Sequence, residues 1–197
     1  MRKLKKKLCA FTVFVFITLT PVFTHTFSAG AKFFGLSMHP RGAANAPLIP
    51  YKFDSRGIFV LHPGVTLNFD YFLWKDIVSV KAVQGLYADC AMQFAGFSHV
   101  GFRIRLFKIG RFSMNTGIGP TFLYRQSWYK LPGYKDKLTF YRGTKDEDWQ
   151  YRFILYGGEI ENNIQVNDKF DVSISVIPGG IDLINVSFGA RYNYKAP

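Results

Sequence analysis

The sequence predicts an all-β fold, an eight-stranded antiparallel transmembrane β-barrel with an up-and-down meander. The composition is 18% aromatic and includes 18 glycines, which favours strands and tight turns over helices. Several segments alternate apolar and polar side chains, as strands between lipid and a lumen do. Beyond Ala31 no uncharged apolar run approaches the roughly 18 residues of a membrane helix, so a chain that spans a membrane must do so as a closed barrel.

Residues 1–31 are expected to be a cleaved secretory signal peptide, which leaves residues 32–197 as the barrel domain. The segment Met1–Lys7 is cationic, Leu8–Thr20 is apolar, and Ala29-Gly30-Ala31 has the small-x-small form that signal peptidase accepts. The alternative is a retained membrane anchor, because the segment that follows Lys7 carries no Lys, Arg, Asp or Glu up to Ala31.

The formal net charge of +12 does not indicate a nucleic-acid partner. Five basic residues lie within the first seven positions, and the others are spread among strands and loops without the clustered stripe that phosphate binding needs. After removal of the signal peptide Cys90 is the only cysteine, which excludes an internal disulfide. No role is assigned to this thiol.

The first four strands are read from the alternation of apolar and polar residues. In the second of them Phe59 and Tyr71 belong to one face, while Asp70 belongs to the other. In the fourth, Arg103 and Arg105 share a face, and a midplane arginine facing lipid costs about 2–4 kcal/mol, so both are expected to face the lumen. The expected ranges are 32–38, 58–72, 77–94 and 99–107.

The last four strands contain two interruptions that predict bulges. Pro120 removes a hydrogen-bond donor from the fifth strand, and Gly157-Gly158 breaks the phase of the sixth so that Glu159 and Glu161 share a face. The closing strand ends three residues before the C-terminus and must pair with the short first strand to close the sheet. The expected ranges are 112–125, 149–166, 170–178 and 181–194.

The connections between these strands are of two lengths. The long ones, 39–57 and 126–148, fall at one end of the barrel, and every link at the other end is short. Short turns on the periplasmic side and longer outer loops are typical of outer-membrane barrels, and an even number of strands places both termini in the periplasm.

The chain resembles small eight-stranded outer-membrane β-barrels of Gram-negative bacteria. The pattern Ser187-x-Gly189-x-x-Tyr192-x-Tyr194 is similar to the C-terminal signal by which the assembly machinery recognises such barrels, although Lys195-Ala196-Pro197 follows it here. The resemblance implies a monomer in contact with outer-membrane lipid. The alternative is a soluble lipocalin-like barrel, in which the apolar face turns inward and encloses a ligand.

A set of charged residues is expected to fill the lumen, because the interior of an eight-stranded barrel is just wide enough for side chains. Opposite charges in this set are expected to pair and to form a plug, since unpaired interior charges are costly. A narrow channel is the alternative. The set is Asp70, Lys81, Arg103, Arg105, Glu159, Glu161 and Arg191.

The sequence predicts neither a cofactor nor a metal site, because phosphate-loop, dinucleotide, nucleophile-elbow and paired-cysteine motifs are missing. The leading hypothesis is a non-enzymatic barrel whose two long outer loops serve surface interaction or envelope support. Arg125, Lys130 and Arg142 are candidates for contact with lipopolysaccharide. The enzyme alternative is a lipid A acyl hydrolase that uses Ser98 and His99, although neighbours on a strand point to opposite faces.

Overall fold

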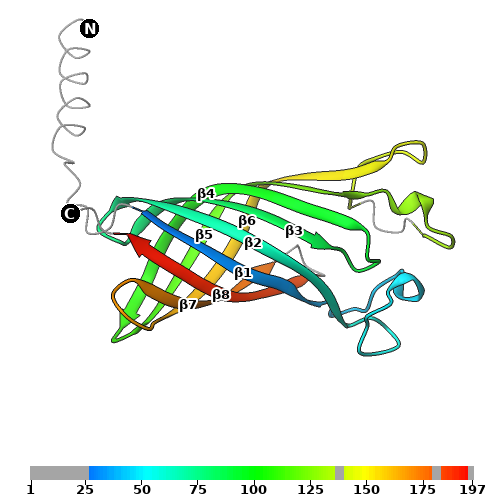
Figure 1. Cartoon of the computed structure of the whole chain (residues 1–197). Coiled ribbons are helices and arrows are strands. Elements are labelled where there is room, and N and C mark those ends of the chain that lie inside the picture. The colour runs from blue at the N-terminus through cyan, green and yellow to red at the C-terminus, as the bar shows by residue number, and fades with distance from the viewer. Residues whose placement is uncertain (1–26, 136–139, 179–182, 195–197) are drawn as a thin grey trace, which may run out of the picture.

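The computed structural model describes residues 27–135, 140–178 and 183–194 of the 197-residue chain. Each strand pairs antiparallel with the next, and the last pairs with the first, so the predicted closed eight-stranded meander is confirmed (Figure 1). The strands are β1 (Phe27–Met38), β2 (Phe59–Trp74), β3 (Val78–Ala88), β4 (Phe94–Ile109), β5 (Phe112–Gln126), β6 (Trp149–Gln165), β7 (Phe170–Pro178) and β8 (Ile184–Tyr194).

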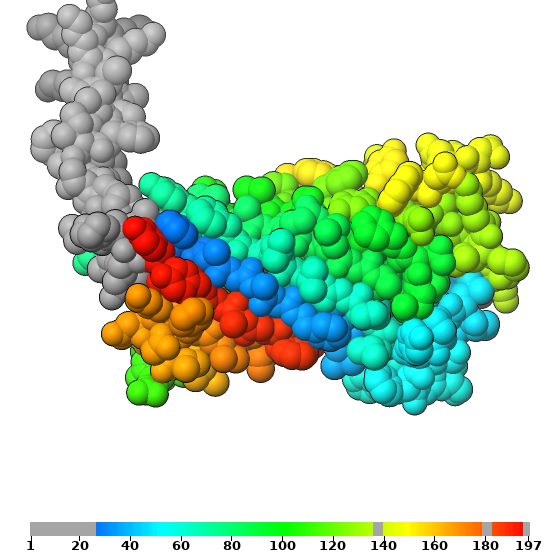
Figure 2. Space-filling view, viewed as in Figure 1, coloured from blue at the N-terminus to red at the C-terminus, as the bar shows by residue number. Residues whose placement is uncertain are grey.

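The seam between β1 and β8 is longer than the sequence predicted. It runs from the pair Phe27 and Tyr194 to the pair Met38 and Ile184, and Figure 2 shows the two strands side by side along one face. The first strand therefore begins five residues before Lys32, within the segment expected to be removed. Residues 1–26 of the predicted signal peptide lie outside the described residues.

The turn between β3 and β4 lies at 89–93, before the link at 95–98 that the sequence predicted. Asp89 makes this turn, because its Oδ1 accepts the backbone N–H groups of Ala91 and Gln93 at 2.9 and 3.0 Å. Met92 supports it with a left-handed φ of 61°. Gly96, within the expected link, lies inside β4 and pairs with Tyr124 of β5.

Both predicted bulges are present, and they are one feature. Gly119 of β5 pairs with Gly157 of β6, and Thr121 pairs with Ile154. Between these pairs β5 has one residue, Pro120, whereas β6 has two. The shift lets Gln150 on one side of it and Glu161 on the other both lie buried in the lumen.

The barrel is apolar outside and polar inside. Leu67 and Phe102 are 58% and 62% exposed on the outer wall, whereas Lys81, Arg103 and Glu161 are at most 2% exposed in the lumen. Outward aromatic residues gather near both ends, as in the stacked pair Phe27–Tyr194 and the edge-on pair Phe94–Trp149. This distribution is opposite to that of a soluble lipocalin-like barrel, so that alternative is wrong. Across the described ranges no helix is long and apolar enough to cross a membrane.

The two ends of the barrel differ as predicted. At the turn end the links 75–77, 110–111 and 166–169 are short, and β1 starts beside the end of β8. At the loop end lie the long connections 39–58 and 127–148, which gather at the same end in Figures 1 and 2. The described parts of the two long connections contain the 3-10 turns Ala46–Leu48 and Trp128–Lys130.

Gly189 is expected to be essential for close packing at the β1–β8 seam. A Cβ there would overlap the carbonyl oxygen of Ala31 and lie 2.5 Å from the Cα of Lys32, and these backbone atoms cannot rotate away. Gly189→Ala should therefore lower the free energy of unfolding by about 1–3 kcal/mol, measured by urea titration of the heat-modifiable folded band. Gly158→Ala is the control, because its Cβ would have a single neighbour, 3.7 Å away. Equal stability of the two variants would contradict a tightly packed seam.

Candidate functional site

The interior of the barrel has three levels along its axis. A shallow polar pocket of about 40 Å³ lies at the turn end and is lined by Phe72, Asp76 and Arg105 among others. A network of buried charges crosses the middle. Above that network, toward the loop end, lies a cavity of about 410 Å³ whose lining includes Lys32, Lys81 and Glu159 at its floor.

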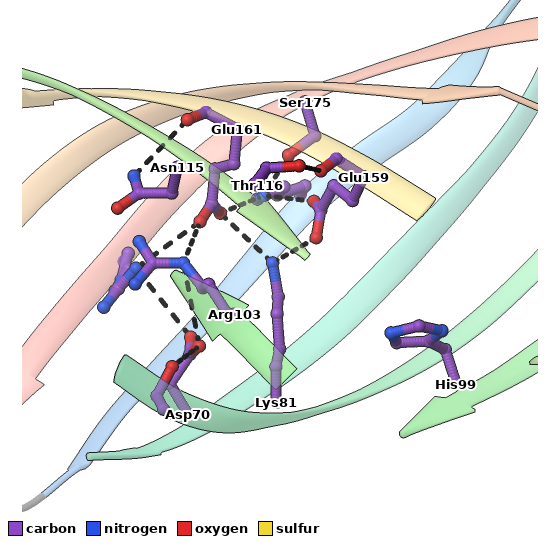
Figure 3. A network of polar contacts seen from close by, with 12 residues as sticks. Asp70, Lys81, His99, Arg103, Asn115, Thr116, Glu159, Glu161 and Ser175 are labelled. Atoms are coloured by element: carbon purple, nitrogen blue, oxygen red, sulfur yellow. Dashed lines mark hydrogen bonds and ion pairs between the residues drawn. The ribbon is translucent and has the colours of Figure 1, made fainter. Parts of the chain in front are cut away.

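The carboxylate of Glu161 on β6 is the centre of the charged network (Figure 3). Its Oε1 lies 2.5 Å from Nζ of Lys32 and 3.4 Å from Nζ of Lys81. Its Oε2 lies 2.9 Å from Nε of Arg103 and 3.5 Å from Nη1 of Arg191. One carboxylate therefore faces cations from β1, β3, β4 and β8.

Two further carboxylates complete the network. Glu159 pairs with Lys81 and lies 3.3 Å from Nζ of Lys32. Asp70 accepts a hydrogen bond from Ser79 Oγ at 3.0 Å and lies 3.8 Å from both Arg103 and Arg191. Apart from Glu159, whose side chain is 13% exposed, every side chain in these ion pairs is at most 3% exposed.

The network sets four cations against three carboxylates, an excess of one positive charge, in a space from which solvent is largely excluded. Burying a charge costs several kcal/mol, and only opposite charges and hydrogen bonds at close range offset that cost. Lys32 also donates to Ser175 Oγ at 2.5 Å, and Asn115 donates to the carbonyl of Glu161 at 3.3 Å, so hydroxyl and amide groups supplement the ion pairs. The network obstructs the lumen as a plug.

The structure brings together six of the seven charged residues expected in the lumen. Arg105 is the exception, because it lies in the shallow pocket at the turn end beside Asp76 and Asp171. Sequence reasoning missed Lys32, which it treated as the start of the mature chain. The alternation of β1 would have identified it, because Ser28 and Lys32 are buried while Phe33 is exposed.

The cavity above the plug has mostly apolar walls. On one side the rings of Phe34, Tyr87 and Phe97 pack around each other, with Phe34 4.9 Å from Tyr87 and 5.6 Å from Phe97. On the other side the wall is formed by Leu123 of β5 and Ile154 of β6. Its volume lies within the range of about 300–1,000 Å³ that is usual for small-molecule sites.

A cluster of aromatic and polar side chains stands at the mouth of this cavity. The guanidinium of Arg125 lies 4.1 Å from the ring centres of both Trp128 and Tyr141 and donates to Gln150 Oε1 at 3.0 Å. Asp89 accepts the indole N–H of Trp128 at 2.5 Å. Arg125 is therefore held at the mouth by these contacts, and its contact with lipopolysaccharide stays a prediction.

Burial changes the pKa of three titratable side chains at the mouth of the cavity. Burial raises the pKa of Asp89, in opposition to its hydrogen bonds from Gln93 and Trp128. Burial likewise raises the pKa of Tyr141 to about 12 and that of Cys90 to about 12. The thiol form of Cys90 is thus favoured by burial, and its Sγ lies 3.7 Å from Nε2 of His39.

The candidate catalytic pair does not meet. Ser98 points to the outer surface, where its Oγ donates to Gln84 Oε1 at 2.7 Å. His99 points to the lumen, where its Nδ1 lies 2.7 Å from Thr121 Oγ1. The two side chains lie on opposite faces of β4, as alternation along a strand requires, so they cannot act as nucleophile and base.

The remaining candidates are placed as follows. Lys130 and Arg142 are exposed, and Lys130 forms an exposed ion pair with Asp148. In β8 Ser187 is buried in the lumen, whereas Tyr194 is exposed on the outer wall beside Phe27. Over the described ranges no cluster of three His, Cys, Asp or Glu residues is arranged to hold a metal ion.

Neither a family model nor a curated protein matches the chain. Among solved structures, it is similar to the N-terminal β-barrel domain of OprF from Pseudomonas aeruginosa, at 12% identity and a TM-score of 0.45, over 85% of this chain and 97% of that one. It is also similar to Ail, the attachment invasion locus protein of Yersinia pestis, at 12% identity and a TM-score of 0.44, over 85% and 96% of the two chains. The likeness concerns the fold and indicates no ligand or activity.

Lys81 is expected to be needed for stability because it neutralises Glu159. Lys81→Met should lower the free energy of unfolding by about 3–5 kcal/mol, since it removes the closer of the two lysines that pair with the buried carboxylate of Glu159 and leaves only Lys32, at 3.3 Å. Lys130→Met is the matched control, because Lys130 and Asp148 are both more than half exposed, and it should cost at most about 1 kcal/mol. Both are read from urea unfolding in lipid vesicles. Equal effects would mean that the plug adds nothing to stability.

Proposed function

We propose that this chain spans a bacterial outer membrane as a monomeric, non-conducting barrel that acts by binding at its loop end. The observation that carries the proposal is the inverted burial, with apolar side chains such as Leu67 and Phe102 exposed around the barrel and charges buried within it. Water cannot solvate such an outer surface without a large cost, whereas lipid can. Aromatic pairs near both ends of the barrel suit the two membrane interfaces.

The orientation follows from the two kinds of connection. The tight turns, the start of β1 and the end of β8 share one end and belong in the periplasm, where turns of outer-membrane barrels are short. The connections 39–58 and 127–148 then face the cell exterior. The closing strand would present Ser187, Gly189, Tyr192 and Tyr194 to the assembly machinery before the seam forms.

The loop end is built for binding because the two long connections form one unit. Asn45 Nδ2 donates to the carbonyl of Lys135 at 3.0 Å, and the N–H of Lys135 donates to Asn45 Oδ1 at 2.9 Å. Lys130 and Arg142 are exposed on the same side, where lipopolysaccharide phosphates would lie. The separation of Ser98 from His99 argues against the lipid A hydrolase alternative.

The membrane assignment predicts how the protein fractionates. After cell lysis it should sediment with the outer membrane, and the unheated protein should migrate faster on a denaturing gel than the boiled protein, because the folded barrel resists the detergent. The mature chain should start at or before Phe27, as read by intact mass, since cleavage after Ala31 would remove part of the seam. Recovery of the protein in the soluble periplasm would refute the proposal.

The plug predicts that the barrel does not conduct ions. Protein reconstituted in a planar bilayer should show no defined conductance steps, because the pairs of Glu161 with Lys32, Arg103 and Arg191 cross the lumen. Steps that change in size with Arg103→Ala would instead support the narrow-channel alternative. Protease protection verifies that the protein is inserted in the same bilayers. The absence of conductance can then be attributed to the plug.

A further inference from the structure

We propose that the 410 Å³ cavity takes the single apolar chain of a membrane amphiphile, which reaches it sideways from the outer leaflet through a notch between β6 and β7. This inference rests on the proposed function, because it needs the barrel to lie in a bilayer. It identifies the ligand class and the route, neither of which follows from the barrel fold.

The notch arises from unequal strand lengths. The pairing of β5 with β6 extends from Trp149 to Ile164, whereas β7 pairs with β6 only from Ile160 to Gln165. Farther toward the loops, a backbone bridge between Arg142 and Tyr151 covers part of the free edge of β6. Among the described residues, no strand pairs with the β7-facing edge of β6 between this bridge and Ile160.

The cavity reaches this notch from inside. Its lining includes Ile154, Gly157 and Gly158 of β6 together with Ile177 and Pro178 at the end of β7. Two successive glycines place no side chain across the opening, and a Cβ on Gly158 would meet only one atom within 4 Å. Over the described residues, the cavity therefore reaches the free edge of β6 at this position without a side chain of β6 between them.

The surface next to the notch is as apolar as a lipid contact requires. Phe153, Leu155 and Tyr156 precede the two glycines on β6 and are 57%, 53% and 74% exposed. A hydrocarbon chain that leaves the bilayer here passes from one apolar surface to another. Toward the loops, Asn45 and Lys135, which hydrogen-bond to each other, also line the cavity.

The charges around the cavity indicate that the buried part of the ligand is uncharged. Lys32 and Lys81 at the floor are neutralised by Glu159 and Glu161. Arg125 at the mouth is enclosed by two aromatic rings. A buried ligand charge would find no free partner among these groups, whereas a hydrocarbon chain gains by burial against Phe34, Phe97 and Leu123 and their neighbours.

The test uses 12-bromododecanol, a single-chain alcohol whose bromine quenches tryptophan at short range. The full mature chain is reconstituted in nanodiscs of dimyristoylphosphatidylcholine as a single-tryptophan variant, Trp74→Phe/Trp149→Phe, that keeps Trp128 in the cavity lining. Quenching of Trp128 should saturate with alcohol concentration. In the converse variant, which keeps only the outward Trp149, quenching should rise without saturation, because it reports partition into the bilayer.

A filled cavity provides the discriminating comparison. Leu123→Phe/Ile154→Phe adds bulk inside and should raise the half-saturating concentration at Trp128 about tenfold. Leu67→Phe/Ile104→Phe makes the same exchanges on the outer wall, on β2 and β4 and away from the notch, and should leave it unchanged. Heat-modifiable migration must match in both variants. Unsaturable quenching of Trp128, or equal affinity in the two variants, overturns the cavity assignment.

The lateral route has its own test. Gly158→Leu places a bulky side chain at the notch. The rate at which Trp128 quenching reaches saturation, measured by stopped flow, should fall at least about fivefold, since one added apolar group commonly changes access or binding by that order. An unchanged rate overturns the lateral route. Outer-membrane fractionation uses none of these residues, so failure of the cavity assignment is distinguishable from failure of the proposed function.

Discussion

The carboxylate of Glu161 is the interaction on which the rest of the barrel depends. It faces cations from four other strands, and Asp70 on β2 shares two of those cations, so one cluster connects β1, β2, β3, β4, β6 and β8. Its partners are far away in sequence, as the separation of 129 residues between Lys32 and Glu161 shows. Such a cluster cannot form until the sheet is closed, and the buried charges then resist its opening, because separated partners would remain in a medium that solvates them poorly.

A local backbone irregularity makes this cluster possible. Without the extra residue in β6 opposite Pro120, strict alternation would put either Gln150 and Ile154 or Glu159 and Glu161 on the lipid side. Because of the bulge, Gln150 and Ile154 before it and Glu159 and Glu161 after it all point into the lumen. The first two supply an amide and an apolar group toward the loop end, and the last two supply carboxylates toward the turn end. The same interruption supplies Gly157 and Gly158. The inward-facing carboxylates of the plug and the two glycines beside the notch therefore both depend on one insertion in one strand.

Much of this architecture can be predicted from the sequence, for reasons that particular residues make clear. Alternation in β2 and β4 is strong because lipid admits only apolar side chains, and it identified the lumen-facing Asp70 and Arg103. The bulge was predicted from the missing donor of Pro120 and from the two glycines at 157 and 158. Alternation failed in β1, because the small residues Ala29-Gly30-Ala31 are compatible both with a strand and with a signal-peptidase cleavage site. Lys32 was therefore overlooked. The turn at Asp89 was missed because its signal is a side-chain cap and not a glycine. The cavity is invisible to alternation, since its volume depends on how rings from four strands fill the lumen.

The position of the plug limits what the loop end can do. A through-pore would let a bound molecule leave on the periplasmic side, but Lys32, Lys81 and Glu159 form both the floor of the cavity and the top of the ion-pair cluster. Nothing that reaches the cavity can leave through the plug, because passage would require buried charges to lose their partners at a cost of several kcal/mol each. The geometry therefore favours reversible binding over transport. It also couples a bound chain to Lys32, Lys81 and Glu159, which belong to the cluster that holds the barrel closed.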